Sequence, residues 1–177
     1  MANVKLYAFL SQPQFVFATL GLASAFSVGF AFYLQIFQDL PPCVLCQYQR
    51  LPYFTIVAIA SLGILVSRHT KYFKLTGFMA TLCALTFFIG SIIALFQFGV
   101  EMKWWKGTAG CGVTGLDATS FETLKDTIMN SPLTNCGDVL WRYLGVSLAG
   151  WNLLWSTSLT IVSGIFARLW IKRKKHA

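Results

Sequence analysis

The stretch Pro41-Pro42-Cys43-Val44-Leu45-Cys46-Gln47-Tyr48-Gln49-Arg50 decides how this chain is organised, because it separates two long apolar runs. Residues 6–38 before it and residues 51–67 after it contain no Asp, Glu, Lys or Arg. Proline cannot continue a helix from the residues before it, but it suits the positions just before a helix start. The stretch therefore predicts a helix that begins at about Cys43, at the surface of a membrane.

Two cysteines and an arginine follow i, i+3, i+7 spacing in this helix: Cys43, Cys46 and Arg50 are expected to share one face. A helix N-terminus and a nearby guanidinium both favour a thiolate over a thiol. A lone Arg at this depth could instead extend to the lipid headgroups. Arg50 is one turn from Cys46 and is the only cation in its loop, which favours a candidate redox site at the bilayer boundary.

The composition indicates an integral membrane protein. Of 177 residues, 56% are hydrophobic and 11% are charged, whereas a typical soluble domain has about 25% charged residues. A bilayer core about 30 Å thick requires about 20 helical residues. We expect one all-α membrane domain, a four-transmembrane-helix bundle with spans at about 14–36, 50–67, 75–98 and 147–168. Ala23-Ser24-Ala25 resembles a signal-peptide cleavage site, but the apolar stretch around it is longer than a signal peptide's, so we favour an uncleaved span.

The charge distribution predicts the topology of these spans. The net charge is +8, and nine of the fourteen Lys and Arg residues lie near the N-terminus, at 68–74 or near the C-terminus. All six acidic residues lie in the other two loops, at about 37–49 and 99–146. The positive-inside rule puts both termini and the 68–74 loop in the cytoplasm, and the other two loops outside. The basic tail at 172–175 is then an anchor facing anionic lipid, and no nucleic-acid partner is expected.

Four of the five cysteines lie in the two outer loops: Cys43, Cys46, Cys111 and Cys136. An even number of cysteines in an oxidising compartment is consistent with disulfides. The remaining cysteine, Cys83, lies within the third expected span, where we expect a small buried apolar residue.

Metal, haem and purely structural roles are the alternatives for these cysteines. Both histidines, His69 and His176, are expected on the opposite side of the membrane, although an all-thiolate site stays open, to be tested by metal analysis. Haem attachment is disfavoured because Gln47, not His, follows the Cys-x-x-Cys pair. A non-catalytic scaffold with two structural disulfides is the rival from another class of protein. Two redox pairs would instead relay electrons to an acceptor dissolved in the bilayer, and a quinone fits a site between Cys46, Arg50 and the span ends.

The long outer loop has features of its own. Thr119-x-x-Glu122 fits a capping box and predicts a short amphipathic helix at about 120–129, which either lies on the membrane surface or packs on the bundle end. Trp104-Trp105 is typical of an interfacial aromatic belt, and we expect Glu101 to be solvated nearby.

The order of motifs closely resembles the bacterial disulfide bond formation protein B (DsbB) family. The resemblance rests on Pro-Cys43-Val44-Leu45-Cys46-x-Tyr48-x-Arg50, on four spans in this charge arrangement, on Gly-Val-Glu-x-x-Trp-Trp at 99–105, and on Cys111 followed by Cys136. It implies a thiol–quinone oxidoreductase of the bacterial inner membrane, with the redox cysteines on the periplasmic face. The implied cofactor is ubiquinone or menaquinone from the membrane pool, and the implied partner is a periplasmic DsbA-like thiol oxidase.

The resemblance also implies a role for each cysteine. Cys111 and Cys136 form the disulfide that oxidises the partner, and Cys111 is the sulfur attacked. Cys136 then exchanges with Cys43, which leaves Cys46 as the thiolate beside the quinone, stabilised by Arg50. The nearest enzyme alternative, a vitamin K epoxide reductase-like protein, carries its Cys-x-x-Cys after the loop cysteines, whereas here it comes first.

Overall fold

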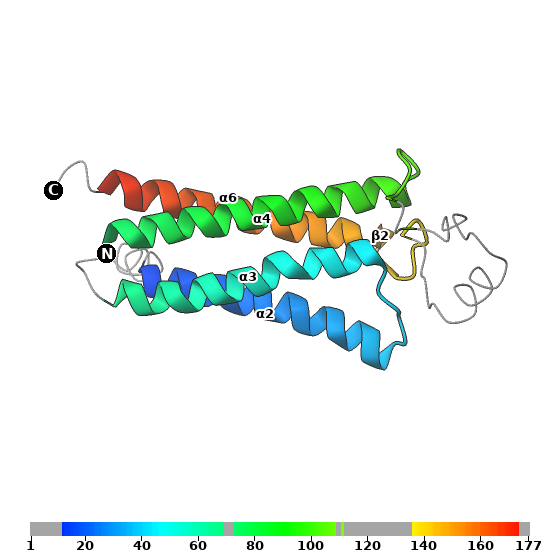
Figure 1. Cartoon of the computed structure of the whole chain (residues 1–177), viewed down its shortest axis with the longest axis horizontal. Helices are drawn as coiled ribbons and strands as arrows, with labels where there is room; N and C mark the ends of the chain where they lie inside the picture. Colours follow the sequence, from blue (N-terminus) through cyan, green and yellow to red (C-terminus); the bar gives the residue numbers. More distant parts are fainter. Residues whose placement is uncertain (1–11, 69–72, 109–110, 112–135, 174–177) are drawn as a thin grey trace, which may run out of the picture.

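The computed structural model describes residues 12–68, 73–108, 111 and 136–173. Within these residues the chain forms four long helices and a short hairpin: α2 (Pro13–Phe37), α3 (Val44–Ser67), α4 (Phe73–Glu101), β1 (Arg142–Tyr143), β2 (Val146–Ser147) and α6 (Leu148–Arg173). Figure 1 shows the helices side by side and alternating in direction, so that α2 begins and α6 ends at the same end of the bundle. The expected all-α fold of four helices is confirmed.

Each of the four helices is long and apolar enough to cross a membrane, with 24 to 27 residues in each apolar segment. A bilayer core requires only about 20 helical residues. Large apolar side chains are exposed along the outer faces of the helices, among them Leu22, Phe26, Phe78 and Ile165. Such surfaces suit contact with lipid, and the chain is a multi-pass membrane protein.

The helices extend beyond the expected spans at the end that carries the cysteines. The second span begins at Val44 rather than at 50, because it is continuous with the helix that follows Cys43. The third continues past 98 to Glu101. The helix expected at 120–129 lies outside the described residues.

A two-stranded hairpin at 142–147 was not predicted. β1 pairs antiparallel with β2, with Tyr143 opposite Val146. Leu144 and Gly145 have φ of 51° and 79°, the two positive values that a tight type I′ hairpin turn requires. The usual sequence signals for this turn are Asn-Gly and Asp-Gly, and Leu-Gly does not carry them. The Trp151 indole N–H donates to the Tyr143 carbonyl over 3.1 Å and holds the hairpin against α6.

The bundle core is built by close contacts between neighbouring helices. α4 packs against both α3 and α6, and α2 packs on α3. The Phe17 ring of α2 contacts the Trp170 ring of α6 at a centroid distance of 5.8 Å. A Cβ on Gly63 would lie 2.8 Å from the Phe17 ring, so only glycine lets α3 approach α2 this closely here.

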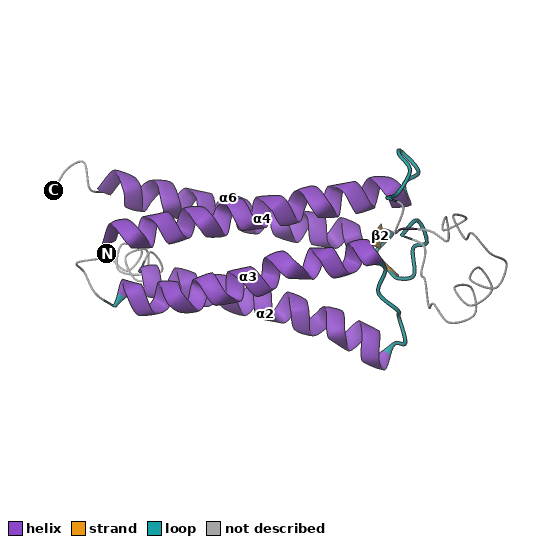
Figure 2. Ribbon diagram, viewed as in Figure 1, coloured by secondary structure: helices purple, strands orange, loops and turns teal. Residues whose placement is uncertain are grey.

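The opposite end of the bundle is more open. Figure 1 shows the last turns of α2 diverging from α3 toward the end where the cysteine-bearing helix begins. Most of the described loop residues, at 38–43, 102–108 and 136–141, gather at this same end (Figure 2). The fold therefore brings all the described outer connections around the start of α3.

Candidate redox site

The first cysteine pair is placed by the start of α3. Cys43 occupies the N-cap position, and its Sγ accepts a hydrogen bond from the backbone N–H of Cys46 over 3.3 Å. This bond satisfies one of the amide groups that a helix start leaves without a partner. The expected helix start at about Cys43 is thus confirmed.

The two sulfur atoms of this pair are in direct contact. Cys43 and Cys46 are free cysteines, and the Cys43 thiol donates to Cys46 Sγ over 2.8 Å. The pKa of the Cys43 thiol is raised above its ordinary value, first by this hydrogen bond and then by burial, which disfavours the charged form. The raised pKa favours a singly ionised pair in which Cys43 carries the proton and Cys46 carries the negative charge.

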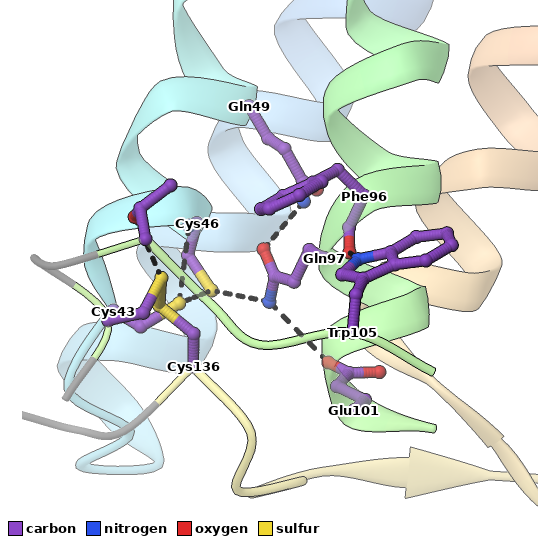
Figure 3. Close-up of a disulfide and its surroundings, with 10 residues drawn as sticks. Cys43, Cys46, Gln49, Phe96, Gln97, Glu101, Trp105 and Cys136 are labelled. Carbon is purple, nitrogen blue, oxygen red and sulfur yellow. Dashed lines mark hydrogen bonds between the residues drawn. A yellow bond between two sulfur atoms is a disulfide. The ribbon is translucent and has the colours of Figure 1, made fainter. Parts of the chain in front are cut away.

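An amide from α4 contacts the Cys46 sulfur (Figure 3). Gln97 Nε2 donates to Cys46 Sγ over 3.2 Å and to Glu101 Oε1 over 3.4 Å. Gln97 Oε1 accepts from Gln49 Nε2 of α3 over 2.6 Å. Both glutamines are buried, with 5% and 7% of their surfaces exposed. The amide N–H groups of Gln97 thus face two acceptors, which favours this orientation of its side chain.

The side chain of Arg50, a residue of α3, contacts the end of α2. Its Nη1 donates to Gln35 Oε1 over 2.8 Å, and its guanidinium carbon lies 4.8 Å from the centroid of the Phe32 ring. Arg50 and Cys46 line the same cavity. Among the described contacts, the hydrogen bonds to the Cys46 sulfur come from Cys43 and Gln97 rather than from Arg50.

The second cysteine pair packs against the first. A disulfide joins Cys111 to Cys136, with Cα atoms 4.9 Å apart, and the Cys136 N–H donates to the Cys111 carbonyl over 3.0 Å. Figure 3 shows this disulfide next to Cys43. One cluster contains all four cysteines; its buried members are Cys43, Leu45, Val100, Cys111 and Cys136, with Cys46 packed against them. The structure therefore brings together the four cysteines that the sequence places in two separate loops.

The fifth cysteine lies away from this cluster. Cys83 is fully buried among apolar side chains in the middle of the bundle, as expected. Across the described residues, His, Cys, Asp and Glu side chains do not form a group of three or more that could hold a metal ion.

A cavity of about 310 Å³ adjoins the cysteines. Apolar residues of α2, including Phe30 and Leu34, form one wall, and Trp155 of α6 contributes to another. Cys46 and Arg50 are among the few reactive or charged groups that line it. Apolar walls with a few convergent polar groups are typical of sites for small organic molecules, and the volume lies at the lower end of that range.

Three polar residues of the site were not singled out from the sequence: Gln49, Gln97 and Asn152. All three lie in helices that cross the membrane, where unpaired polar groups are costly and often functional. Their position as polar residues within apolar spans was the sequence feature that could have identified them. The expectation that Glu101 is solvated is wrong for one of its oxygens, because Oε2 is buried at the cavity wall.

Four apolar helices with two packed cysteine pairs at one end are the arrangement expected of a membrane-embedded thiol–disulfide oxidoreductase. A family model described as "Disulfide bond formation protein DsbB" matches residues 13–166. The chain belongs to this family.

Curated relatives agree with this assignment. The chain is 30% identical to "Disulfide bond formation protein B" of Xylella fastidiosa (strain Temecula1) over 154 residues, 84% of this chain and 85% of the relative. It is also 30% identical to the protein of that name from Hahella chejuensis over 160 residues, 87% of this chain and 91% of the relative. The Xanthomonas campestris (strain 8004) protein of that name is 29% identical over 145 residues, 79% and 81% of the two chains. No solved structure matches the chain.

Proposed function

We propose that this protein reoxidises a periplasmic thioredoxin-like dithiol protein of the DsbA type and passes the electrons to a membrane quinone. The observation that carries the proposal is the single cluster of all four cysteines, three buried and Cys46 partly buried, next to a largely apolar cavity at the end of a membrane bundle. Sulfur atoms in one cluster can exchange bonds directly, and a lipid-soluble acceptor can reach such a cavity from the bilayer.

The partner would react first with the Cys111–Cys136 disulfide. A partner thiolate attacks Cys111 Sγ, the Cys111–Cys136 bond breaks, and Cys136 leaves as a thiolate. Cys136 then attacks Cys43 in a Cys43–Cys46 disulfide, which releases the Cys46 thiolate. Thiol–disulfide exchange of this kind moves two electrons at each step and needs no other oxidant.

The partner then leaves in its oxidised form. Its second thiolate attacks the mixed disulfide and releases Cys111. Cys111 in turn attacks the Cys136–Cys43 bond, which restores the Cys111–Cys136 disulfide and leaves Cys43 and Cys46 as the reduced pair.

Reformation of the Cys43–Cys46 disulfide requires an acceptor for two electrons and two protons, which a quinone supplies on becoming quinol. The cavity suits its flat ring, with apolar walls from α2 and Arg50 available to a carbonyl oxygen. Cys46 lines that cavity and is the sulfur that would react with the quinone. Cys43 holds the proton that must be released when the two sulfurs join.

The reduction potential of the first pair must be high for this direction of flow. DsbA-type oxidases have potentials of about −120 mV, and ordinary structural disulfides lie below about −300 mV, a gap of about 8 kcal/mol for two electrons. Hydrogen bonds that favour the reduced pair raise its potential. The donor from Gln97 to Cys46 and the contact between Cys43 and Cys46 are of this kind.

The proposed location is the bacterial inner membrane, with both termini in the cytoplasm and the cysteine end of the bundle at the periplasm. The concentration of Lys and Arg near the termini and at 68–74 supports this orientation.

Anaerobic mixing tests the proposal. Full-length protein is mixed with a reduced DsbA-type partner and a short-chain ubiquinone or menaquinone analogue, and quinol formation is followed by absorbance. We expect one quinol for each partner disulfide formed. Cys46→Ser should abolish turnover, whereas Cys83→Ala, which removes the thiol outside the site, should retain it. Normal turnover by Cys46→Ser would contradict the proposal and favour a scaffold with structural disulfides.

A further inference from the structure

A line of buried polar side chains connects α6 to the Cys46 sulfur. Starting in α6, the Ser156 hydroxyl lies 2.8 Å from the Tyr53 hydroxyl of α3. Tyr53 donates to Asn152 Oδ1, which returns the line to α6. Asn152 Nδ2 then donates to Gln49 Oε1 of α3. Ser156, Tyr53 and Gln49 are all buried.

The second half of the line leads from Gln49 to the sulfur. Gln49 Nε2 donates to Gln97 Oε1 of α4 over 2.6 Å, and Gln97 Nε2 donates to Cys46 Sγ over 3.2 Å. Figure 3 shows Gln97 between Gln49 and Cys46. Three helices, α3, α4 and α6, thus contribute to one continuous path that ends at the sulfur.

All the hydrogen bonds in this path have the same direction. Gln97 must turn its N–H groups toward Cys46 and Glu101, because both of those partners are acceptors. Its carbonyl must therefore accept from Gln49, and the carbonyl of Gln49 must accept from Asn152.

The same reasoning sets the hydroxyl end of the path. The Asn152 carbonyl accepts the one hydroxyl hydrogen of Tyr53, so Ser156 is the donor to the Tyr53 oxygen. Each group donates toward Cys46, and hydrogen bonds aligned in this way polarise and strengthen one another.

Helix packing alone does not account for this arrangement. Buried amides and hydroxyls often join helices within a membrane, each contributing a modest stabilisation. Packing would be served equally by a closed ring of polar groups or by a path of mixed direction. Here each group of the path donates toward the same sulfur, and the last group, Gln97, contacts both Cys46 and Glu101.

We propose that this hydrogen-bond path selects Cys46 as the anionic sulfur of the pair, with Tyr53 and Asn152 acting as positioning residues through Gln49 and Gln97. The proposal rests on the proposed function only in taking Cys46 as the sulfur that reacts. Removal of the Tyr53 hydroxyl leaves the Asn152 carbonyl without its donor and frees the amides to turn. A turned Gln97 would present its carbonyl oxygen to the sulfur and destabilise the thiolate.

The test measures the ionisation of Cys46 directly, without quinone and without turnover. Full-length Cys43→Ser protein is extracted in detergent and freed of quinone, so that Cys46 is the only thiol at the site. Its alkylation by iodoacetamide is followed by mass spectrometry from pH 5 to pH 10. Gln97→Met should move the midpoint of the rate profile up by about one pH unit, as expected for loss of one hydrogen bond to a charged group. Tyr53→Phe should move it in the same direction by about a third of that.

Tyr48→Phe is the matched control, because Tyr48 is exposed, lies in α3 closer to Cys46 in sequence, and is outside the path. It should leave the midpoint unchanged. Combining Tyr53→Phe with Gln97→Met should add nothing to the Gln97→Met shift, because the path is already cut. Thermal unfolding of each variant checks that the bundle is intact.

Two outcomes would overturn the inference: a Tyr53→Phe midpoint equal to that of Tyr48→Phe, or a Tyr53→Phe shift that persists in full in the Gln97→Met background. The first means that the path does not reach the sulfur, and the second means that Tyr53 acts by another route. Neither depends on quinol formation. Failure of the proposed electron transfer and failure of this inference are therefore separate results.

Discussion

Arg50 Nη1 donates a hydrogen bond to Gln35 Oε1 over 2.8 Å, and this bond joins the start of α3 to the end of α2 beside the cavity. The same guanidinium lies against the Phe32 ring. Two independent contacts therefore hold the Arg50 side chain at the cavity wall, one helical turn from Cys46.

Replacement of Arg50 by Lys should weaken quinone binding while preserving the charge. A lysine ammonium is a single point of charge, and it cannot both stack on Phe32 and hold the donor geometry toward Gln35. We expect the KM for a short-chain quinone analogue to rise about tenfold, with a smaller change in kcat. Arg68→Lys, at the far end of α3, is the control and should behave like the parent. An unchanged KM in Arg50→Lys would remove Arg50 from the proposed quinone site.

Alkylation of the fully reduced protein should distinguish Cys43 from Cys46. Because the pKa of Cys43 is raised, its thiolate stays scarce above pH 9, where an ordinary thiol is already half ionised. We expect initial iodoacetamide labelling of Cys46 to exceed that of Cys43 at least about tenfold at pH 8, since each pKa unit changes the thiolate fraction about tenfold. Tandem mass spectrometry of the peptide that contains both residues gives the ratio. Labelling should become nearly equal in unfolded protein; equal labelling in the folded protein would refute the assignment.

The fit of Trp105 over α4 should make Gly99 intolerant of a side chain. A Cβ on Gly99 would overlap Cζ2 of the Trp105 indole, so the ring would have to move. That movement would break the bond from Trp105 Nε1 to the Phe96 carbonyl, now 2.9 Å. We expect Gly99→Ala to lower the free energy of unfolding by about 1–3 kcal/mol. Thermal unfolding in detergent measures the effect.

Gly164→Ala is the matched control for that substitution. Nothing lies within 4 Å of a Cβ at Gly164, and the residue is also helical. Alanine there should be neutral or stabilising by up to about 1 kcal/mol. If the two variants unfold at the same temperature, the Trp105 contact contributes little to stability.

The proposed orientation can be read by labelling intact cells. The background is a variant in which all five cysteines are replaced by alanine. One variant then carries a single cysteine in place of Asp138, which lines the cavity. The other carries a single cysteine in place of Ser67, at the opposite end of α3. A membrane-impermeant maleimide should label Asp138→Cys in intact spheroplasts and Ser67→Cys only after lysis. The reverse pattern would place the redox site in the cytoplasm and end the proposed partnership with a periplasmic protein.

The helices could be predicted because their determinants are local. Uncharged runs of sufficient length located the four spans, and Pro41-Pro42 located the start of α3 to within a residue. The helix ends near the site were less predictable. The third span was expected to end at about 98, whereas α4 continues to Glu101, so Glu101 belongs to the helix and lines the cavity rather than lying in a loop.

The polar part of the site depends on contacts between distant residues. Gln49 and Asn152 are more than 100 positions apart, and nothing in either neighbourhood specifies the other. From the sequence, Arg50 was predicted to be the group beside the Cys46 sulfur, because it is the nearest cation along the helix. Besides Cys43, the described side-chain donor to the sulfur is Gln97 of a neighbouring helix, because α3 and α4 pack closely at this level.

The length of α4 has a consequence for how a membrane carrier would be used. A helix of 29 residues is about 44 Å long, whereas the hydrocarbon layer is about 30 Å thick. The surplus turns must stand in the polar zone, and the end that carries Gln97 and Glu101 suits that depth. An isoprenoid tail could then remain among the acyl chains while its ring reaches the sulfur. Quinol would leave and quinone would enter by lateral diffusion in the bilayer past the diverging end of α2, without either one entering water.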